Sequence, residues 1–262
     1  CVLFVFAGCQ KEKELVSYAT DVSFSAAQSA TEMDAMFVVG YDYAKHFSNS
    51  SPLTVLPESA QVTFLDSLFS DGNGINYTIT FGVLGNQTPY GLSCLDGKSR
   101  AGSVICQLNK PISEIGATLV MKNLSSFYTG NGSEMFLLEG DITAIRTKSS
   151  TFKLTSNLVI EELESSSMSW NADLEILEGQ EGYTYTGTAK GLSSNMQSYN
   201  LEIDVPLARV DNCTNTFATG SCFIKSGEEE EVILDFNPYN QGECDRVARA
   251  MVKRFEKIFY VY

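Results

Sequence analysis

The sequence predicts an all-β protein, an antiparallel meander that forms a sandwich or an open barrel and is preceded by one N-terminal helix. Three observations support this fold class. After about residue 53, apolar and polar residues alternate with period 2, and turn signals separate the alternating runs at hairpin spacing. No segment between these runs is long enough to form the helix of a parallel crossover. Clean alternation is typical of antiparallel sheets that have one packed face and one solvated face.

The N-terminal helix is predicted over residues 21–46, within a helix-and-linker region of 21–52. Ser23 or Ser25 is a candidate N-cap, and the polar segment 48–52, which ends in proline, terminates the helix. His46 lies at the expected C-terminal end, where a cation interacts favourably with the helix dipole. Residues with apolar side chains recur at roughly helical spacing: Phe24, Ala27, Met33, Met36, Phe37 and Tyr41.

The β domain is predicted over residues 53–262, with roughly ten to twelve strands. Its clearest strand is the run from 199 to 207, in which Glu202 and Asp204 are expected to face solvent. The other face of this strand is expected to be buried: Tyr199, Leu201, Ile203, Val205 and Leu207. Turn signals lie at 71–74, 130–132, 178–179 and 226–227.

The composition excludes several classes of function. The chain has 262 residues with 18 basic and 32 acidic side chains, so its formal net charge is −14. Such a chain is repelled by phosphate backbones, and no nucleic-acid partner is expected. The single histidine argues against histidine-based catalysis and zinc sites, and we expect no cofactor.

The N-terminal residues predict export and lipidation. Residues 1–8 are apolar, and Phe6-Ala7-Gly8-Cys9 resembles a bacterial lipobox, which has small residues before a cysteine that is lipidated after cleavage. We therefore expect 1–8 to be the remnant of a signal peptide, Cys9 to carry the lipid, and 9–20 to be a charged tether. The alternative is a buried N-terminal strand. The segment 10–14 also resembles the signal that sends Bacteroidota lipoproteins to the cell surface.

A series of short motifs lies in order between about 75 and 262. They are Thr78-Ile79-Thr80-Phe81-Gly82, Cys94-Leu95-Asp96-Gly97-Lys98-Ser99-Arg100-Ala101-Gly102, Glu139-Gly140 with Arg146, Trp170, Tyr183 to Gly187, Pro206-Leu207 with Cys213, Gly220, Leu234-Asp235-Phe236, and Gly242-Glu243-Cys244-Asp245. In this order they resemble a family of Bacteroidota outer-membrane lipoproteins of unknown function. The resemblance implies a secreted, lipid-anchored β-protein and supplies no catalytic residues.

The C-terminal segment 245–258 shows a conflict between propensity and resemblance. Its composition favours a helix, with one apolar stripe. The family resemblance instead implies a terminal β-hairpin that turns near Lys253-Arg254. We expect the hairpin.

Cysteine usage predicts disulfides. Five cysteines follow the predicted signal: Cys94, Cys106, Cys213, Cys222 and Cys244. An oxidising compartment favours their pairing, and the odd number leaves at least one thiol free or paired between molecules. The pattern of spacing does not fix the connectivity, but the family resemblance implies Cys213–Cys244.

Four other features of the sequence are candidate binding sites. The loop 71–74 is expected to be a plain turn rather than a calcium loop. The turn 96–102 mixes Asp, Lys and Arg and has two interpretations: a small-anion site, or a turn capped by Asp96 with a positive φ at Gly97, which we favour. Trp170 is expected in the core rather than on a sugar-binding surface, and Glu228 to Glu231 on a solvated hairpin flank.

The sequence therefore predicts a lipid-anchored outer-membrane protein, exposed at the cell surface, that acts as a non-catalytic binding or structural module. Its expected partners are the membrane and either a glycan or another envelope protein. Two alternatives are an outer-membrane β-barrel pore and a secreted hydrolase that uses a carboxylate pair. Asp66-Ser67-Leu68 also fits a minimal O-glycosylation pattern, with Ser67 as the acceptor.

Overall fold

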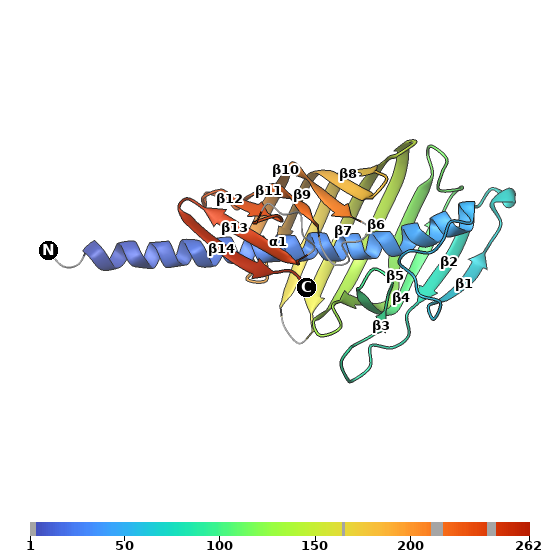
Figure 1. Cartoon of the computed structure of the whole chain (residues 1–262), viewed down its shortest axis with the longest axis horizontal. Coiled ribbons are helices and arrows are strands. Elements are labelled where there is room, and N and C mark those ends of the chain that lie inside the picture. The colour runs from blue at the N-terminus through green and yellow to red at the C-terminus, as the bar shows by residue number, and fades with distance from the viewer. Residues whose placement is uncertain (1–3, 164–165, 211–216, 240–244) are drawn as a thin grey trace.

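A computed structural model describes residues 4–163, 166–210, 217–239 and 245–262. Its architecture is one long helix lying against one curved antiparallel sheet (Figure 1). The predicted fold class, all-β with a single N-terminal helix, is confirmed. The helix passes between strands: β13 and β14 cross in front of it, and β5 to β8 lie behind it (Figure 1).

The described part of the chain contains helix α1, a short 3-10 helix and fourteen strands. They are α1 (Phe4–Asn49), β1 (Gln61–Asp66), η1 (Phe69–Asp71), β2 (Ile75–Thr80), β3 (Leu92–Ser93), β4 (Ser99–Leu108), β5 (Thr118–Gly130), β6 (Met135–Lys148), β7 (Thr151–Glu162), β8 (Ser167–Glu178), β9 (Gly182–Leu192), β10 (Ser198–Val210), β11 (Thr219–Lys225), β12 (Val232–Asp235), β13 (Val247–Val252) and β14 (Phe255–Tyr260).

The strands form a meander in which nearly every strand pairs with its neighbours in the chain. The sheet order is β1-β2-β4 and then sequential to β14, and the short β3 pairs beside β4. All pairs are antiparallel. The described residues thus form one continuous sheet with β1 and β14 at its edges, which decides against the sandwich in favour of the open arrangement.

Helix α1 fills the concave side of the sheet. From Ala19 to Ala44 nearly every residue is buried, whatever its position around the helix, because strands cover the helix from several sides. Small residues permit the close approach. A side chain at Gly40 would place its Cβ 2.5 Å from the Met121 sulfur of β5.

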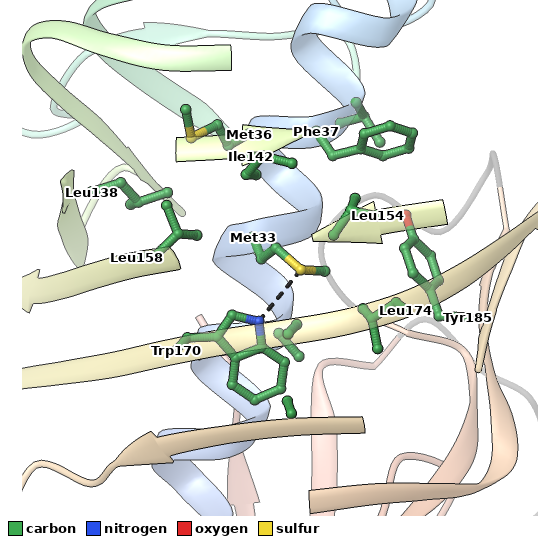
Figure 2. Close-up of a cluster of buried hydrophobic side chains, with 14 of the residues drawn as sticks. Met33, Met36, Phe37, Leu138, Ile142, Leu154, Leu158, Trp170, Leu174 and Tyr185 are labelled. Atoms are coloured by element: carbon green, nitrogen blue, oxygen red, sulfur yellow. Dashed lines mark hydrogen bonds between the residues drawn. The ribbon is translucent and has the colours of Figure 1, made fainter. Parts of the chain in front are cut away.

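The hydrophobic core lies between α1 and the inner face of the sheet (Figure 2). Trp170 of β8 is 2% exposed, and its indole N–H donates a hydrogen bond to the Met33 sulfur at 3.4 Å (Figure 2). This confirms the expected core position of Trp170. Around this pair lie Met36, Phe37, Leu138, Ile142, Leu154, Leu158, Leu174 and Tyr185.

The helix is longer than predicted. It begins at Phe4 instead of about residue 21, so the segment expected as a tether, 9–20, is helical. The N-cap prediction is wrong, because Ser23 and Ser25 lie inside the helix and are fully buried. At 23–25 the chain is already inside the helix and packed against the sheet, so no cap is needed there.

The predicted facing of β10 is correct at its start and wrong at one position. Tyr199, Leu201 and Leu207 are buried and Ile203 is only partly buried, whereas Val205 is 50% exposed. The pairing register shifts between Glu202 and Leu207 on the β9 side and on both sides of Val205 on the β11 side. Such bulges insert extra residues and break the period-2 alternation, which turns Val205 outward.

The C-terminal segment forms the expected hairpin. Strands β13 and β14 pair in register around a two-residue turn at Lys253-Arg254. Lys253 adopts a positive φ of 52°, so the turn does without the glycine that tight hairpins favour. Pairing with β12 and burial of alternate residues outweigh the helical propensity of this segment.

Candidate functional site

The concave side of the sheet carries a buried charged group, here called the Asp96 cluster, which consists of Asp34, Asp96, Arg100, Tyr185 and Arg209. The Arg100 guanidinium is fully buried and grips the Asp96 carboxylate with two hydrogen bonds of 2.7 and 2.6 Å. It also donates to the main-chain oxygen of Ala35 on α1 at 3.1 Å. Burial by itself raises the pKa of Asp96, but the Arg100 charge outweighs this effect and holds the pKa below its usual value.

The other half of the Asp96 cluster holds the helix. Asp34 of α1 pairs with Arg209 of β10 at 2.9 Å and accepts a hydrogen bond from the Tyr185 hydroxyl of β9. Burial raises the pKa of Asp34, and the Arg209 charge opposes this shift. Asp34 and Arg100 of the cluster therefore join α1 to the sheet.

Other buried polar contacts also attach the helix to the sheet. Lys98 pairs with Glu32 of α1 at 2.8 Å and donates to the main-chain oxygen of Tyr262. Near the end of α1, the Asp42 carboxylate accepts hydrogen bonds from the main-chain N–H groups of residues 54–56. Glu178 of β8 binds Lys45 of α1 at 2.9 Å. All these charges serve to fix α1 in place.

The convex face of the sheet carries a different arrangement, here called the β8–β11 groove. It is an open groove of about 650 Å³ on the side of the sheet that faces away from α1. Its outward-facing side chains come from β8, β9, β10, β11 and the residue before β12: Asn171, Asp173, Thr188, Lys190, Asn200, Glu202, Phe223, Lys225 and Glu231.

The pairing register arranges these side chains in two rows. In the first row, Asn171 lies opposite Lys190, Lys190 opposite Asn200, and Asn200 opposite Lys225. Neighbouring strands are about 4.8 Å apart, so the two lysine Cα atoms are about 9.6 Å apart.

The second row runs parallel to the first and two residues along each strand. Asp173 lies opposite Thr188, Thr188 opposite Glu202, and Glu202 opposite Phe223. The first row thus holds amides and ammonium groups, and the second holds carboxylates, a hydroxyl and an aromatic ring.

The charged side chains of the groove are exposed to solvent, unlike the buried ion pairs of the concave side. Asp173 forms one exposed ion pair with Lys153 at 3.3 Å. Within the described ranges, Lys190, Lys225 and Glu202 form no ion pair, and all three are exposed. Phe223 is half-buried at the end of the second row. The groove therefore offers hydrogen-bond donors, acceptors and an aromatic surface to solvent.

Alternation in the sequence correctly indicates that residues such as Glu202 face outward, but the groove itself was missed. Its members come from four strands and the residue before a fifth, and only the pairing register places them side by side. The one usable signal was the repeated amide and lysine at outward positions of successive strands, as at Asn171, Lys190, Asn200 and Lys225.

The predicted modification sites are placed as follows. Cys9 lies within α1, and its side chain is outside the described part of the chain. Cys213 and Cys244, the expected disulfide, both lie outside the described residues. Ser67 is exposed between β1 and η1, and the Asp66 carboxylate beside it accepts the N–H of Leu68 at 3.0 Å.

Cys94, Cys106 and Cys222 are buried free thiols and do not pair with one another. Each lies in a core position, so for these three the expectation of disulfides is not supported. Burial raises the pKa of the Cys106 thiol to about 12 and also raises the pKa of Cys222. These cysteines act as small core residues.

The turn 96–102 is a capped turn and not an anion site. Gly97 has a φ of 73°, and Asp96 accepts the main-chain N–H of Lys98 at 3.3 Å. The basic side chains of Lys98 and Arg100 are already paired with Glu32 and Asp96. This confirms the favoured interpretation of the sequence.

The remaining candidate sites are structural or solvated. Asp71 accepts the N–H of Asn73 at 3.0 Å, so the loop 71–74 is the plain turn expected. His46 lies in the last turn of α1, and its Nδ1 is 2.8 Å from the Ser51 main-chain oxygen. Residues 228–231 are exposed between β11 and β12. Among the described residues, no group of three or more His, Cys, Asp or Glu side chains is arranged to hold a metal ion.

Comparison with protein-family models, with curated proteins and with solved structures finds no match to this chain. In the described part of the chain, no helix combines the length and apolar character needed to span a membrane. The β8–β11 groove therefore has to be interpreted from its own chemistry.

Proposed function

We propose that this protein is a lipid-anchored, surface-exposed outer-membrane module that binds a ligand in the β8–β11 groove and does not catalyse a reaction. One observation carries the proposal: the groove brings exposed polar and charged side chains next to a half-buried aromatic ring, and within the described residues its two lysines and Glu202 form no ion pair. Binding sites commonly combine such convergent polar groups with an aromatic surface.

The carboxylates of the groove favour binding over hydrolysis. A general acid in glycoside hydrolysis needs a raised pKa, which enzymes obtain by removing the carboxyl group from water. Asp173 and Glu202 are both exposed to solvent, and the Asp173 side chain retains 61% of its accessible surface. This environment supports a role in hydrogen bonding to a ligand.

The interior of the sheet supports a binding module over the alternative of a pore. A pore needs a water-filled lumen, whereas here α1 and the core side chains occupy the concave side. The anchoring part of the proposal rests on the lipobox-like segment that ends at Cys9. From Cys9 to Ala19, the first buried residue among the side chains that the structure describes, the helix extends about 15 Å, so in this proposal α1 joins the lipid to the sheet as a rigid spacer.

The anchor is tested by labelling cells that express the full chain with an alkyne analogue of palmitate. We expect label on the wild-type protein and on Cys1→Ala, and no label on Cys9→Ala. Label that persists in Cys9→Ala would contradict the anchor.

The binding role is tested with an array that carries both glycans and envelope or host proteins. The full chain is expected to bind at least one spot, and the double variant Lys190→Ala/Lys225→Ala is expected to lose that binding. The matched control, Lys148→Ala/Lys257→Ala, removes two exposed lysines outside the groove. Absence of binding, or equal binding by the groove variant, would contradict the proposed function.

A further inference from the structure

The two rows of the β8–β11 groove present complementary hydrogen-bonding chemistry to one ligand. The amides and ammonium groups of the first row are rich in N–H donors, and the carboxylates of the second row only accept. The rows are two residues apart along the strands, about 6.8 Å. We propose that the ligand of the groove is a neutral oligosaccharide that lies across β8 to β11; this assignment rests on the proposed function.

A sugar ring matches both rows at once. Each sugar hydroxyl donates one hydrogen bond and accepts others, so a ring between the rows accepts from Lys190 and Asn200 and donates to Glu202 and Asp173. A peptide that lies across the face of a sheet finds no main-chain partner there, because the N–H and C=O groups of the strands already bond to one another. The mixed rows therefore fit a polyhydroxyl ligand.

Phe223 supplies the apolar surface that such a ligand needs. The side chain is half-buried and lies opposite Glu202, at the end of the acceptor row. A sugar ring has an apolar face formed by its C–H groups, and an aromatic ring offers a large rigid surface for it at low cost in conformational entropy. The groove thus combines polar contacts at the ring edge with apolar contact at the ring face.

The negative charge of the groove and of the whole chain favours a neutral ligand over an acidic one. The lining of the groove contains three acids, Asp173, Glu202 and Glu231, against two lysines. The whole chain has a formal net charge of −14. A polyanion such as a uronate polymer would be repelled by both, whereas a neutral glycan is not affected.

The size of the groove indicates an oligosaccharide. From β8 to β11 the surface spans three strand spacings, about 14 Å, and the groove encloses about 650 Å³. A single monosaccharide would contact only part of the two rows.

The assignment is tested by affinity electrophoresis of the full chain in native gels. The gels contain starch, xyloglucan, mannan or arabinan as neutral polysaccharides, and polygalacturonate as the acidic one. We expect retardation by at least one neutral polysaccharide, little change of that retardation at higher salt, and no retardation by polygalacturonate.

Matched variants locate the binding. Phe223→Ala and Glu202→Gln are each expected to weaken retardation by about 10-fold, whereas the controls Tyr260→Ala and Glu175→Gln retain it. Tyr260 is an exposed aromatic on the edge strand β14, and Glu175 is an exposed acid on the same face of β8, outside the groove lining. Circular dichroism of each variant checks that the fold is kept.

The outcomes separate the ligand class from the proposed function. No retardation by any polysaccharide, retardation by polygalacturonate alone, or equal weakening by groove and control variants would overturn the neutral-glycan assignment. If envelope proteins on the array were still bound through Lys190 and Lys225, the proposed binding role would stand while the glycan assignment failed. Shortening of the retarded polysaccharide during incubation would contradict a non-catalytic role.

Discussion

The concave and convex faces of the sheet both carry charged residues, but they use them differently. On the concave face, Arg100, Asp96 and Lys98 are almost fully buried, and each is paired within 2.8 Å. On the convex face, Lys190, Lys225 and Glu202 are exposed, and in the described residues they form no ion pair. Buried charges must be paired because an unpaired one is very costly, whereas solvated charges are free to meet a ligand. The comparison separates residues that hold the fold from residues that are available for binding.

The largest expected effect comes from breaking a concave pair. Arg100→Met leaves the Asp96 carboxylate buried, with Arg209 at 3.9 Å as its nearest remaining cation. We expect the free energy of unfolding to fall by about 3–5 kcal/mol, the usual cost of removing one partner of a buried pair. Urea denaturation measures this change. The control Lys153→Met breaks the exposed pair with Asp173 and should cost less than about 1 kcal/mol. Equal losses in the two variants would contradict the comparison.

Two adjacent residues of β10 test the difference between the concave and convex faces within a single strand. Leu201 is 3% exposed on the concave side, and Glu202 is exposed in the groove. Leu201→Ala should destabilise the protein by about 2–5 kcal/mol because it leaves a cavity in the core. Glu202→Ala should change stability by less than about 0.5 kcal/mol. Thermal and urea denaturation of both variants check the ranking, and the reverse order would show that the facing of β10 is wrong.

An intermediate effect on the stability of the fold is expected when the pH is lowered. Burial by itself raises the pKa of Glu178, but the hydrogen bond and charge of Lys45 outweigh it, so the folded pKa lies below the ordinary value of 4.5. The ionised carboxylate therefore contributes stability above about pH 4.5, and this contribution is lost as the pH falls through the folded pKa.

Glu178→Gln tests this dependence. At pH 7 we expect it to lower the free energy of unfolding by about 1–2 kcal/mol, the range for hydrogen bonds to charged groups. The difference from the wild-type protein should shrink as the pH falls through the folded pKa of Glu178, because the wild-type carboxyl is then itself protonated. Denaturation curves at several pH values measure it, with Glu175→Gln as the exposed control. A difference that grows in acid would contradict the assigned direction of the pKa shift.

The last prediction concerns the reactivity of the buried thiols and requires no mutation. Since burial raises the pKa of Cys106 to about 12, very little of it is thiolate at pH 8. We expect alkylation of Cys106 and Cys222 in the native protein to be at least roughly 100-fold slower than in the unfolded protein. Peptide-resolved mass spectrometry after iodoacetamide treatment measures the rates. Fast native labelling would place these cysteines outside the core.

Local pattern predicted the strands well and the long-range contacts poorly. Alternation in 152–160 indicates the strand β7, and Phe152, Leu154, Leu158 and Ile160 are buried in the core, whereas Val159 is 39% exposed. It did not predict that Glu32, in the middle of α1, is fully buried. The partner of Glu32 is Lys98, which is 66 residues away in the chain. No local rule connects two residues at that separation.

The start of the helix illustrates the same limit. The apolar periodicity and the candidate capping serines predict a start near residue 21, because those signals describe a helix with one face on a surface. Helix α1 is instead surrounded by strands over its central part, so Ser23, Ser25 and Gln28 are as buried as Val22 and Ala26. The distinction between a buried and an exposed helix face disappears when a sheet covers both.

The sequence by itself determined the class of this fold, the order of its hairpins and which side of most strands faces the core. The reason is that successive side chains of a strand point to opposite faces of the sheet, so the sequence pattern has period 2. The sequence also determined the formal net charge of −14. Only the tertiary structure decided that one open sheet curves around α1, that the buried charges pair across it, and that Lys190, Asn200 and Lys225 stand in one row of a groove. These features depend on register and curvature, which bring together residues from distant parts of the chain, and such contacts leave no periodic trace in the sequence.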